Sequence, residues 1–522
     1  MQVILIHRAT SYWTIAIMTA LPVWPDIELM EKARKQLIRQ TALSAMEELT
    51  KMACIGAPLW IVGNTGSDTY TIREEEYQRM FLRAMRPMLT GFECESSRET
   101  AVIRINPHKL VEILMNTRLW AAVFAGIVAR ASTHEVLTPG VAGNYDGALQ
   151  VLTAEFRAPS HLVPTREAYF ARYCRCYEDG SWAVVDVSLD SLCPSPLGRC
   201  IRRPSGCLIH EMPNGCSKVT WVEHVDVDDR GVHYMYKAFV KSGLAFGAKC
   251  WISILDRQCE RLANVMAPCL PTTDPKIMEG RRSMLNLAER IVAGFCGGLS
   301  VSNGQTWTAL CGRGDDEVRI MIRKTVADFG SPLGIVLNAA ISFRLPFGPK
   351  RVFDFLRSLD TRTQWDVLSC GGGVEEIAHV ASGRETGDRV SLFLVISADG
   401  TYKNMLVLQE TWISPTGCFL VYAPVEVVAM LTVLDGVDSS HVKVLPSGFA
   451  IVPDGRPIRN AGRHVETSQS GGSLVTAQFQ ILVDSDPTAR LRIDSITAVN
   501  AIVRGTVYRI KNAMGGSGTG YI

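Results

Sequence analysis

Residues 242–266 read SGLAFGAKCWISILDRQCERLANVM, and this stretch decides the predicted fold. Its apolar side chains recur every three or four residues and its charged side chains occupy the other faces, which predicts one long amphipathic helix. Before this helix the hydrophobic period is two, which is typical of β-strands. Five such segments lie at residues 148–156, 169–175, 182–190, 206–212 and 217–227. Turn sequences join neighbouring segments, so we predict an α+β fold in which a curved antiparallel sheet surrounds the long helix.

The composition excludes two classes of protein. Of the 522 residues, 47% are hydrophobic and 20% are charged, which excludes a mostly disordered chain and leaves room for several domains. The 54 Lys and Arg residues are balanced by 52 Asp and Glu residues and are scattered along the chain. A protein that binds nucleic acid mainly through phosphate contacts needs a stronger positive charge. We therefore expect no direct nucleic-acid binding by this chain.

The cysteines indicate neither a disulfide scaffold nor a metal site. There are 15 of them at irregular spacings, and no two are separated by two residues. Cys193, Cys200, Cys207 and Cys216 form a series, but their gaps fit no common zinc-binding motif. We expect free thiols in a reducing compartment, with no metal.

The first 30 residues form an atypical leader. Residues 9–25 carry no charge and follow Arg8, which resembles a signal peptide. The stretch is short and contains Pro22 and Pro25, so it does not predict a membrane-spanning helix. We interpret residues 1–30 as an unstructured leader, and a secreted lipid carrier is the alternative.

The second half of the chain repeats the plan of the first. Four pairs of short matches occur in the same order, namely 109–114 with 350–356, Trp120 with Trp365, 149–155 with 405–410, and 204–206 with 446–448. A closing helix at residues 489–514 corresponds to the helix at 242–266, which indicates a duplicated fold. The predicted units are a first domain at 31–268, a linker at 269–282, a second domain at 283–514 and a flexible tail at 515–522.

No catalytic motif is present. The chain has no His-Glu-x-x-His and no Gly-x-Ser-x-Gly, and its glycine runs lack the Lys-Ser/Thr of a phosphate-binding loop. The ten histidines are dispersed, without an evident nucleophile beside them. We predict that the protein is not an enzyme and needs no cofactor.

Two polar residues lie on predicted strands, where a cavity inside the sheet would reach them. Arg172 lies in YFARY at residues 169–173, and Glu155 lies in LTAEF at residues 152–156. If both side chains point inward, they pair and offer hydrogen bonds to the polar group of a lipid. The alternative is that both face water, because strand alternation alone does not distinguish the two faces. Asp186 lies among valines and has the same two interpretations.

Residues 141–151, VAGNYDGALQV, resemble the START domain of class IV homeodomain–leucine zipper proteins, a family of plant transcription factors. Further stretches that resemble this family lie at residues 182–196, 202–228, 242–261, 332–337, 350–368 and 446–455. The resemblance implies a lipid-binding START domain of helix-grip fold, followed by a START-adjacent domain of similar fold. It also implies a nuclear protein, with the cytoplasm as the alternative location.

The resemblance adds roles for individual residues. In sterol-binding START proteins a buried arginine and an acid hold the ligand's hydroxyl, and Arg172 and Glu155 match these positions. The family also has a homeodomain and a zipper before the START domain. The residues ahead of the first START helix here resemble neither, so DNA binding and zipper dimerisation are not carried over.

The expected function is that of a ligand-binding regulatory protein. A lipid or sterol would bind beneath the helix at 242–266, which acts as a lid and contributes Trp251 and Leu255, and Asp186 would complete the site. Ligand binding would then modulate transcriptional regulation. The alternative is a ligand-free interaction scaffold, or a form that interferes with related transcription factors through protein contacts.

Overall fold

The computed structural model describes residues 27–63, 69–81, 90–141, 143–192, 200–266, 275–302, 306–311, 317–325, 330–366, 373–396, 402–456 and 471–515. Most of the predicted leader and tail, and the linker residues 269–274, lie outside these ranges. Residues 27–30, predicted as leader, begin helix α2 instead. Residues 275–282, predicted as linker, belong to helix α8. Pro275 misled the prediction, because proline is accommodated in the first turn of a helix, where its missing N–H has no partner to lose.

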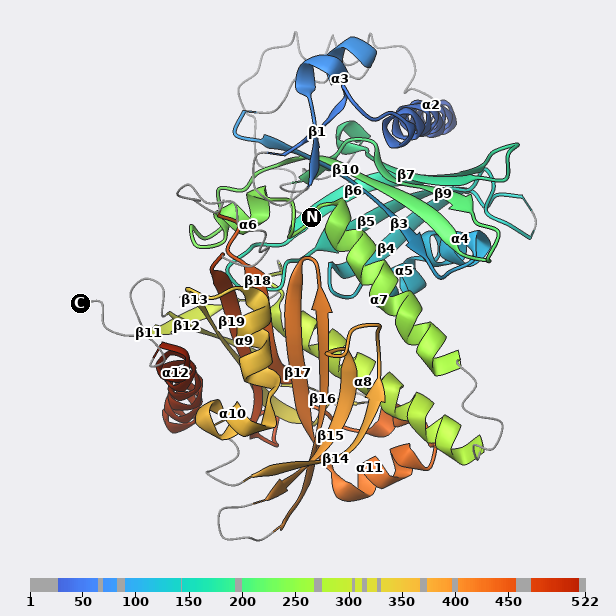
Figure 1. Cartoon of the computed structure of the whole chain (residues 1–522). Coiled ribbons are helices and arrows are strands. Elements are labelled where there is room, and N and C mark those ends of the chain that lie inside the picture. Colours follow the sequence, from blue (N-terminus) through green and yellow to red (C-terminus); the bar gives the residue numbers. More distant parts are fainter. Residues whose placement is uncertain are drawn as a thin grey trace, which may run out of the picture.

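The first domain combines one antiparallel sheet with six helices in the part of the chain that the structure describes (Figure 1). Its strands are β1 (Trp60–Val62), β2 (Tyr70–Ile72), β3 (Glu93–Ile103), β4 (Val128–Thr138), β5 (Leu149–Phe156), β6 (Arg166–Cys176), β7 (Trp182–Ser188), β8 (Cys200–Arg202), β9 (Ser205–Glu211) and β10 (Ser217–Val227). Its helices are α2 (Ile27–Cys54), α3 (Glu74–Met80), α4 (Pro107–Met115), α5 (Thr117–Val123), α6 (Lys237–Lys241) and α7 (Ala248–Met266).

The second domain follows the same plan. Its strands are β11 (Thr308–Cys311), β12 (Val318–Thr325), β13 (Gly334–Leu345), β14 (Val374–Ala381), β15 (Arg389–Ile396), β16 (Tyr402–Ser414), β17 (Gly417–Glu426), β18 (Ser447–Pro453) and β19 (Ser473–Asp484). Its helices are α8 (Pro275–Leu299), α9 (Pro349–Arg357), α10 (Leu359–Trp365), α11 (Val427–Leu434) and α12 (Ile493–Gly515).

Each sheet has two differently covered faces. In the first domain α2 packs on one face, which we call the outer face, and α4, α5 and α7 pack on the other, the grip face. In the second domain α8 covers the outer face, and α9, α10 and α12 cover the grip face. The predicted α+β fold, a sheet around a long helix, is therefore confirmed, and so is the similar second domain.

The duplication extends to every position of the main strand order. The first sheet runs β1-β2-β3-β10-β9-β7-β6-β5-β4, and the second runs β11-β12-β13-β19-β18-β17-β16-β15-β14. Helix α9 takes the place of α4, and Trp365 takes the place of Trp120. One predicted match was wrong, because residues 405–410 lie on β16, which corresponds to β6 rather than to β5. Short alternating segments look alike on any strand, so similarity alone did not fix the strand.

A glycine that the two halves share explains another match. Gly206 on β9 lies opposite Val185, and Gly448 on β18 lies opposite Val421, so the two glycines are equivalent. A Cβ atom at Gly206 would lie 2.0 Å from the carbonyl oxygen of Val184, and Gly206 has a φ of 143°. The close approach of the neighbouring strand therefore requires glycine at this point in both sheets.

Replacing Gly206 with alanine is expected to lower the free energy of unfolding by about 1–3 kcal/mol, because the new methyl group must push two backbones apart. The measurement is chemical denaturation of the full chain. Gly56→Ala is the matched control, because nothing lies within 4 Å of the added Cβ atom. Equal effects of the two substitutions would contradict the packing argument.

Candidate functional site

Arg172 lies on the grip face of the first sheet and pairs with Asp186 on the neighbouring strand. The β6–β7 register places the two residues directly opposite each other. Arg172 Nε and Nη2 donate to the two oxygens of Asp186 at 2.7 and 2.8 Å. Its remaining Nη1 donates to the carbonyl oxygen of Leu114 at the end of α4, at 2.6 Å. Both side chains are buried, so the pair is a fixed part of the domain interior.

Glu155 lies on the opposite face of the same sheet. The β5–β6 register places it opposite Glu167, whereas Arg172 lies opposite Gln150. Glu155 accepts a hydrogen bond from Thr165 Oγ1 at 2.7 Å and is buried. The predicted pair of Arg172 and Glu155 is therefore wrong, and so is the alternative in which both face water. The cause is the strand register, which the alternating pattern of each strand leaves open.

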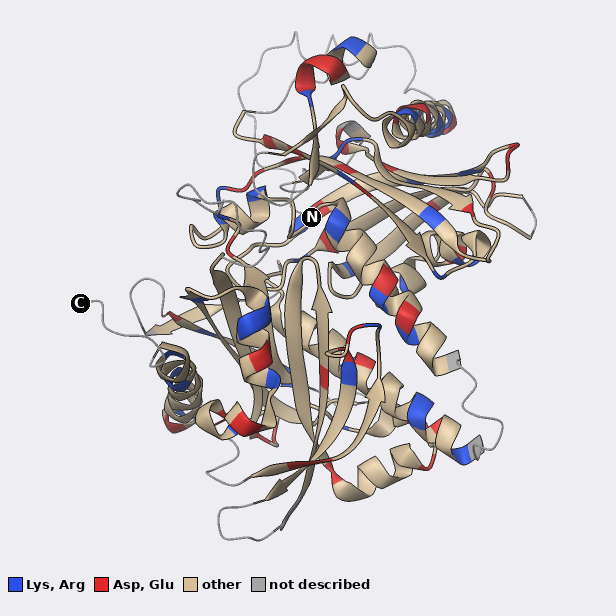
Figure 2. Ribbon diagram, viewed as in Figure 1, with Lys and Arg blue, Asp and Glu red and all other residues tan. Residues whose placement is uncertain are grey.

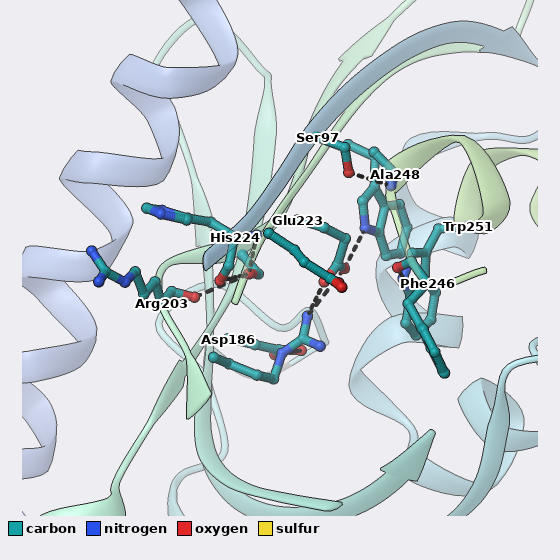
Figure 3. A network of polar contacts seen from close by, with 12 residues as sticks. Ser97, Asp186, Arg203, Glu223, His224, Phe246, Ala248 and Trp251 are labelled. Atoms are coloured by element: carbon teal, nitrogen blue, oxygen red, sulfur yellow. Dashed lines mark hydrogen bonds and ion pairs between the residues drawn. The ribbon is translucent and has the colours of Figure 1, made fainter. Parts of the chain in front are cut away.

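The pair of Arg172 and Asp186 continues into a second ion pair that the sequence did not predict. Arg202 Nε lies 3.8 Å from Asp186 Oδ2, and Arg202 Nη2 donates to both oxygens of Glu223 at 3.1 Å. Trp221 Nε1 donates to Glu223 Oε1 at 2.9 Å. We call Arg172, Asp186, Arg202 and Glu223 the grip network, and Figure 3 shows its end at Glu223. The signal that could have identified it is Glu223, a charged residue in the segment VTWVEHV, which is mostly valine and tryptophan.

Burial dominates the electrostatics of the grip network. Burial raises the pKa of Glu223 above the usual value of a carboxyl group, and the attraction of Arg202 opposes this rise only in part. Among the described residues, Arg202 Nε has no hydrogen-bond acceptor. The network therefore contains one donor that an added oxygen atom would satisfy.

The long helix contacts the network through stacked aromatic rings. Trp251 of α7 stacks between Trp120, at a centroid distance of 6.0 Å, and Trp221, at 5.1 Å. The guanidinium carbon of Arg172 lies 3.9 Å from the ring centre of Trp120. Leu255, one turn after Trp251, is also fully buried in the same core. The predicted lid residue Trp251 is thus itself part of the tryptophan stack that contacts the network, and Leu255 packs in the same core.

The start of α7 is fixed by hydrogen bonds that Figure 3 also shows. The backbone N–H of Ala248 donates to Ser97 Oγ on β3 at 2.9 Å, and Trp251 Nε1 donates to the carbonyl oxygen of Phe246 at 3.2 Å. A serine hydroxyl that accepts from the first turn of a helix compensates one of its unpaired N–H groups.

A cavity of about 250 Å³ lies beside this end of α7 and reaches the grip network. Glu223, Phe246 and Gly247 line its inner part. At its rim, Lys241 Nζ forms an ion pair with Glu93 Oε2 at 2.8 Å, and both side chains are exposed. The cavity therefore connects the protein surface with the buried carboxylate of Glu223.

A second ion pair, of which the arginine is buried, borders the same cavity. Arg166 donates to both oxygens of Glu95 at 2.7 and 2.9 Å and lies 3.0 Å from Asp229. The guanidinium carbon of Arg166 lies 4.0 Å from the ring centre of Phe246. Burial raises the pKa of Glu95 despite its attraction to Arg166. The cavity wall is thus acidic, with aromatic surface beside the charges.

The equivalent position in the second domain has different chemistry. Gln409 on β16 lies opposite Tyr422, as Arg172 lies opposite Asp186. The nearby cation comes from helix α10, where Arg362 Nη1 donates to Gln409 Oε1 at 2.8 Å. Arg362 Nε also donates to Asp366 at 3.0 Å. The two domains therefore share a fold without sharing a site.

The described residues offer neither a metal-binding cluster nor a membrane-spanning helix. No group of three His, Cys, Asp or Glu side chains there is placed to hold a metal ion. None of the described helices is both long and apolar enough to cross a membrane. Of the cysteine series noted above, Cys193 lies outside the described ranges. Burial raises the pKa of Cys200 to about 12 and raises the pKa of Cys207 well above the usual value of a thiol, so both thiols are protonated.

Comparison with protein families identifies both domains. The START domain family matches residues 40–261, and the family of PDF2-like C-terminal domains matches residues 277–516. Among solved structures, human StAR-related lipid transfer protein 5 is 14% identical and covers 44% of this chain and 99% of its own, with a TM-score of 0.33.

Whole relatives match across both domains. Homeobox-leucine zipper protein HDG1 of Arabidopsis thaliana is 44% identical over 91% of this chain, and ANTHOCYANINLESS 2 of the same plant is 42% identical over 92%. The chain spans 60% of the length of each of these two relatives. HDG12 of Arabidopsis thaliana is 38% identical over 95% of this chain, which spans 71% of HDG12. The resemblance seen in the sequence is thereby confirmed, and the chain belongs to the class IV homeodomain–leucine zipper family, of which it contains the START domain and the PDF2-like C-terminal domain.

Proposed function

We propose that the START domain binds a hydrophobic molecule with one polar group beneath α7. The observation that carries this proposal is the cavity of about 250 Å³ that reaches Glu223 at the end of the grip network. Ligand sites are mostly apolar and contain a few fixed polar groups. The aromatic rings of Trp221, Trp251 and Phe246 beside one buried ion-pair network have this composition.

The residues of the site have distinct proposed roles. Glu223 accepts a hydrogen bond from a hydroxyl or N–H group of the ligand, and Arg202 Nε donates to a ligand oxygen. Asp186, which Arg172 holds in place, lies 3.8 Å from the same Nε atom and orients the Arg202 guanidinium. Glu155 takes no part, because it lies on the outer face of the sheet.

Trp251 and Leu255 form the lid in this proposal. The cavity of about 250 Å³ is smaller than the about 300–1,000 Å³ of ordinary ligand sites. A lipid therefore enters only if Trp251 leaves its stack between Trp120 and Trp221, and α7 moves with it. Ligand binding would stabilise the domain by linkage, because the unfolded chain has no such site.

At the level of the whole protein, we propose that this binding regulates a nuclear transcription factor of plants. The homeobox-leucine zipper relatives support this step. We propose a non-enzymatic role, which the START family match and the homeobox-leucine zipper relatives support. Related transcription factors are the proposed protein partners.

Native mass spectrometry of the full chain purified from plant cells tests the ligand, with lipid extraction of the same sample. We expect a discrete additional mass that Glu223→Gln reduces by about tenfold or more in occupancy, because a hydrogen bond to a charged group contributes about 1.5–3 kcal/mol. Glu112→Gln is the control, since Glu112 forms an exposed ion pair with Lys109. Protein that is empty and that no added lipid stabilises would refute the proposal.

The alternative is a ligand-free scaffold, and one observation favours it. Trp120 and Trp251 are fully buried, and with Trp221 they already fill the space between α7 and the sheet. In that case the grip network only makes the domain interior rigid, and the empty outcome of the same experiment supports it.

A further inference from the structure

Helix α7 is held by a different domain at each of its ends. In its first half, Trp251 and Leu255 pack into the START core, and Ser97 accepts from its first N–H. In its second half, Arg257 and Arg261 extend to the PDF2-like domain. Figure 1 shows the helix running between the two sheets, and Figure 2 shows charged residues of both signs along it.

The contact at the second half is centred on one buried carboxylate. Arg257 Nη2 donates to Glu410 Oε1 at 2.8 Å, and Arg261 Nη1 donates to the same oxygen. The Glu410 side chain on β16 is completely buried. We call Arg257, Arg261 and Glu410 the arginine latch. Arg261 Nε also lies 3.3 Å from Glu289 on α8, so the latch contacts both a strand and a helix of the second domain.

Further contacts keep the latch in place. The guanidinium carbon of Arg257 lies 4.2 Å from the ring centre of Trp412 on β16. On the other side of α7, Arg384 forms ion pairs with Glu260 and with Asp256. A hydroxyl cluster joins the domains elsewhere, where Tyr236 Oη lies 2.7 Å from Thr476 Oγ1. The junction therefore has a defined geometry on several sides.

The latch makes the position of α7 matter to both domains. A buried carboxylate is tolerated only while its partners are present, because an unpaired buried charge is strongly destabilising. If α7 moves away from β16, Glu410 loses two guanidinium partners at once. The same helix cannot move without disturbing the tryptophan stack above the grip network. Each domain is thus sensitive to what happens at the other end of α7.

We propose that α7 couples the two domains, so that entry of a ligand beneath Trp251 changes the local stability of β16 and α8 through the arginine latch. The ligand part of this inference rests on the proposed function above. The coupling itself does not, because the contacts of the latch are made by residues of the chain alone. Two separate arms of the test follow from this distinction.

The first arm uses no ligand and measures hydrogen exchange of the full chain by mass spectrometry. Glu410→Gln on the second domain is expected to speed exchange in α7 and in β10 near Glu223 by about tenfold, the effect of losing one charged contact. Arg257→Gln on α7 is the reciprocal variant and is expected to speed exchange in β16 and α8. Exchange in α12 reports whether a variant has simply unfolded the second domain.

The control for both variants is Glu112→Gln, which removes an exposed ion pair within one domain. Changes confined to the mutated domain, with α12 unchanged, would overturn the coupling. Changes that cross the junction in both directions support it, whether or not any ligand binds.

The second arm adds vesicles of phosphatidylcholine and sitosterol to the wild-type chain and to Glu410→Gln. We expect lipid uptake to alter exchange in β16 and α8 at least about twofold in the wild type and not in the variant. Uptake without any change in β16 and α8 would overturn ligand signalling through the latch while leaving the lipid site intact. No uptake would refute the ligand, and the first arm would still decide the coupling.

Discussion

Replacing Arg172 with leucine is expected to lower the free energy of unfolding by about 3–5 kcal/mol. Arg172 forms two hydrogen bonds with the carboxylate of Asp186, and the two side chains are only 3% and 6% exposed. Without Arg172, the cation that remains near Asp186 is Arg202, whose Nε lies 3.8 Å away. The Arg202 guanidinium already forms an ion pair with Glu223. The carbonyl oxygen of Leu114 loses its donor as well. The loss should appear in chemical denaturation of the full chain as a lower midpoint with an unchanged slope.

The double variant Arg172→Leu/Asp186→Leu separates charge from packing. Removing both partners leaves no unpaired charge at this point, so we expect it to recover much of the lost stability. A double variant that is less stable than Arg172→Leu would contradict this account. Arg175→Leu near the end of the same strand is the control, because the Arg175 side chain is exposed.

Acidification from pH 7 to pH 5 is expected to remove about 4 kcal/mol of stability through two buried histidines. Burial lowers the pKa values of His161 and His224 to about 3, whereas the unfolded chain has the ordinary value of 6.5. Below pH 6.5 the unfolded state therefore binds more protons, and stability falls until the pH reaches about 3. At pH 5 the difference of 1.5 pH units costs about 2 kcal/mol for each histidine.

The geometry agrees with neutral rings. Among the described residues, neither ring nitrogen of His161 or of His224 has a hydrogen-bond partner. His161 packs against Trp307 of the second domain at a centroid distance of 5.3 Å, and His224 packs against Tyr77 at 4.9 Å. Arg319 and Arg203 are the nearby cations, and each disfavours a proton on its histidine.

Denaturation at a series of pH values measures this effect. Glu223 and Glu48 act in the opposite sense, because burial raises their pKa values and the folded state then gains protons in acid. The variant His161→Leu/His224→Leu isolates the histidine part, and we expect it to lose less stability than the wild type between pH 7 and pH 5. An identical pH dependence of the two chains would show that the rings are already protonated or exposed.

The sequence was sufficient for the elements and for their repetition. Residues 242–266 predicted α7, which begins at Ala248, because burial of one helix face leaves a direct trace in the pattern. Residues 182–190 predicted β7, whose side chains are buried on both faces of the sheet. The repeated Pro-Ser-Gly predicted equivalent strands. Both Gly206 and Gly448 lie so close to a carbonyl oxygen of the neighbouring strand that a Cβ atom would clash with it.

The sequence did not show which polar side chains of the site pair with each other. Glu155 and Arg172 both lie on strands, but only the register shows that they occupy opposite faces of the sheet. That register depends on the connection between β5 and β6, whose conformation leaves no periodic signal. Arg202 and Glu223 meet across β8 and β10, which are separated in the chain by β9. Such a contact arises from topology rather than from any local pattern.

Strand β16 joins two different environments. Gln409 points to the grip face and accepts from Arg362 inside the second domain. The next residue, Glu410, points to the outer face and binds the arginines of α7. Because side chains alternate along a strand, a single peptide unit separates the interior of one domain from the helix of the other. A shift of this strand by one residue that brought Glu410 to Arg362 would bring Thr411, which carries no charge, to Arg257 and Arg261.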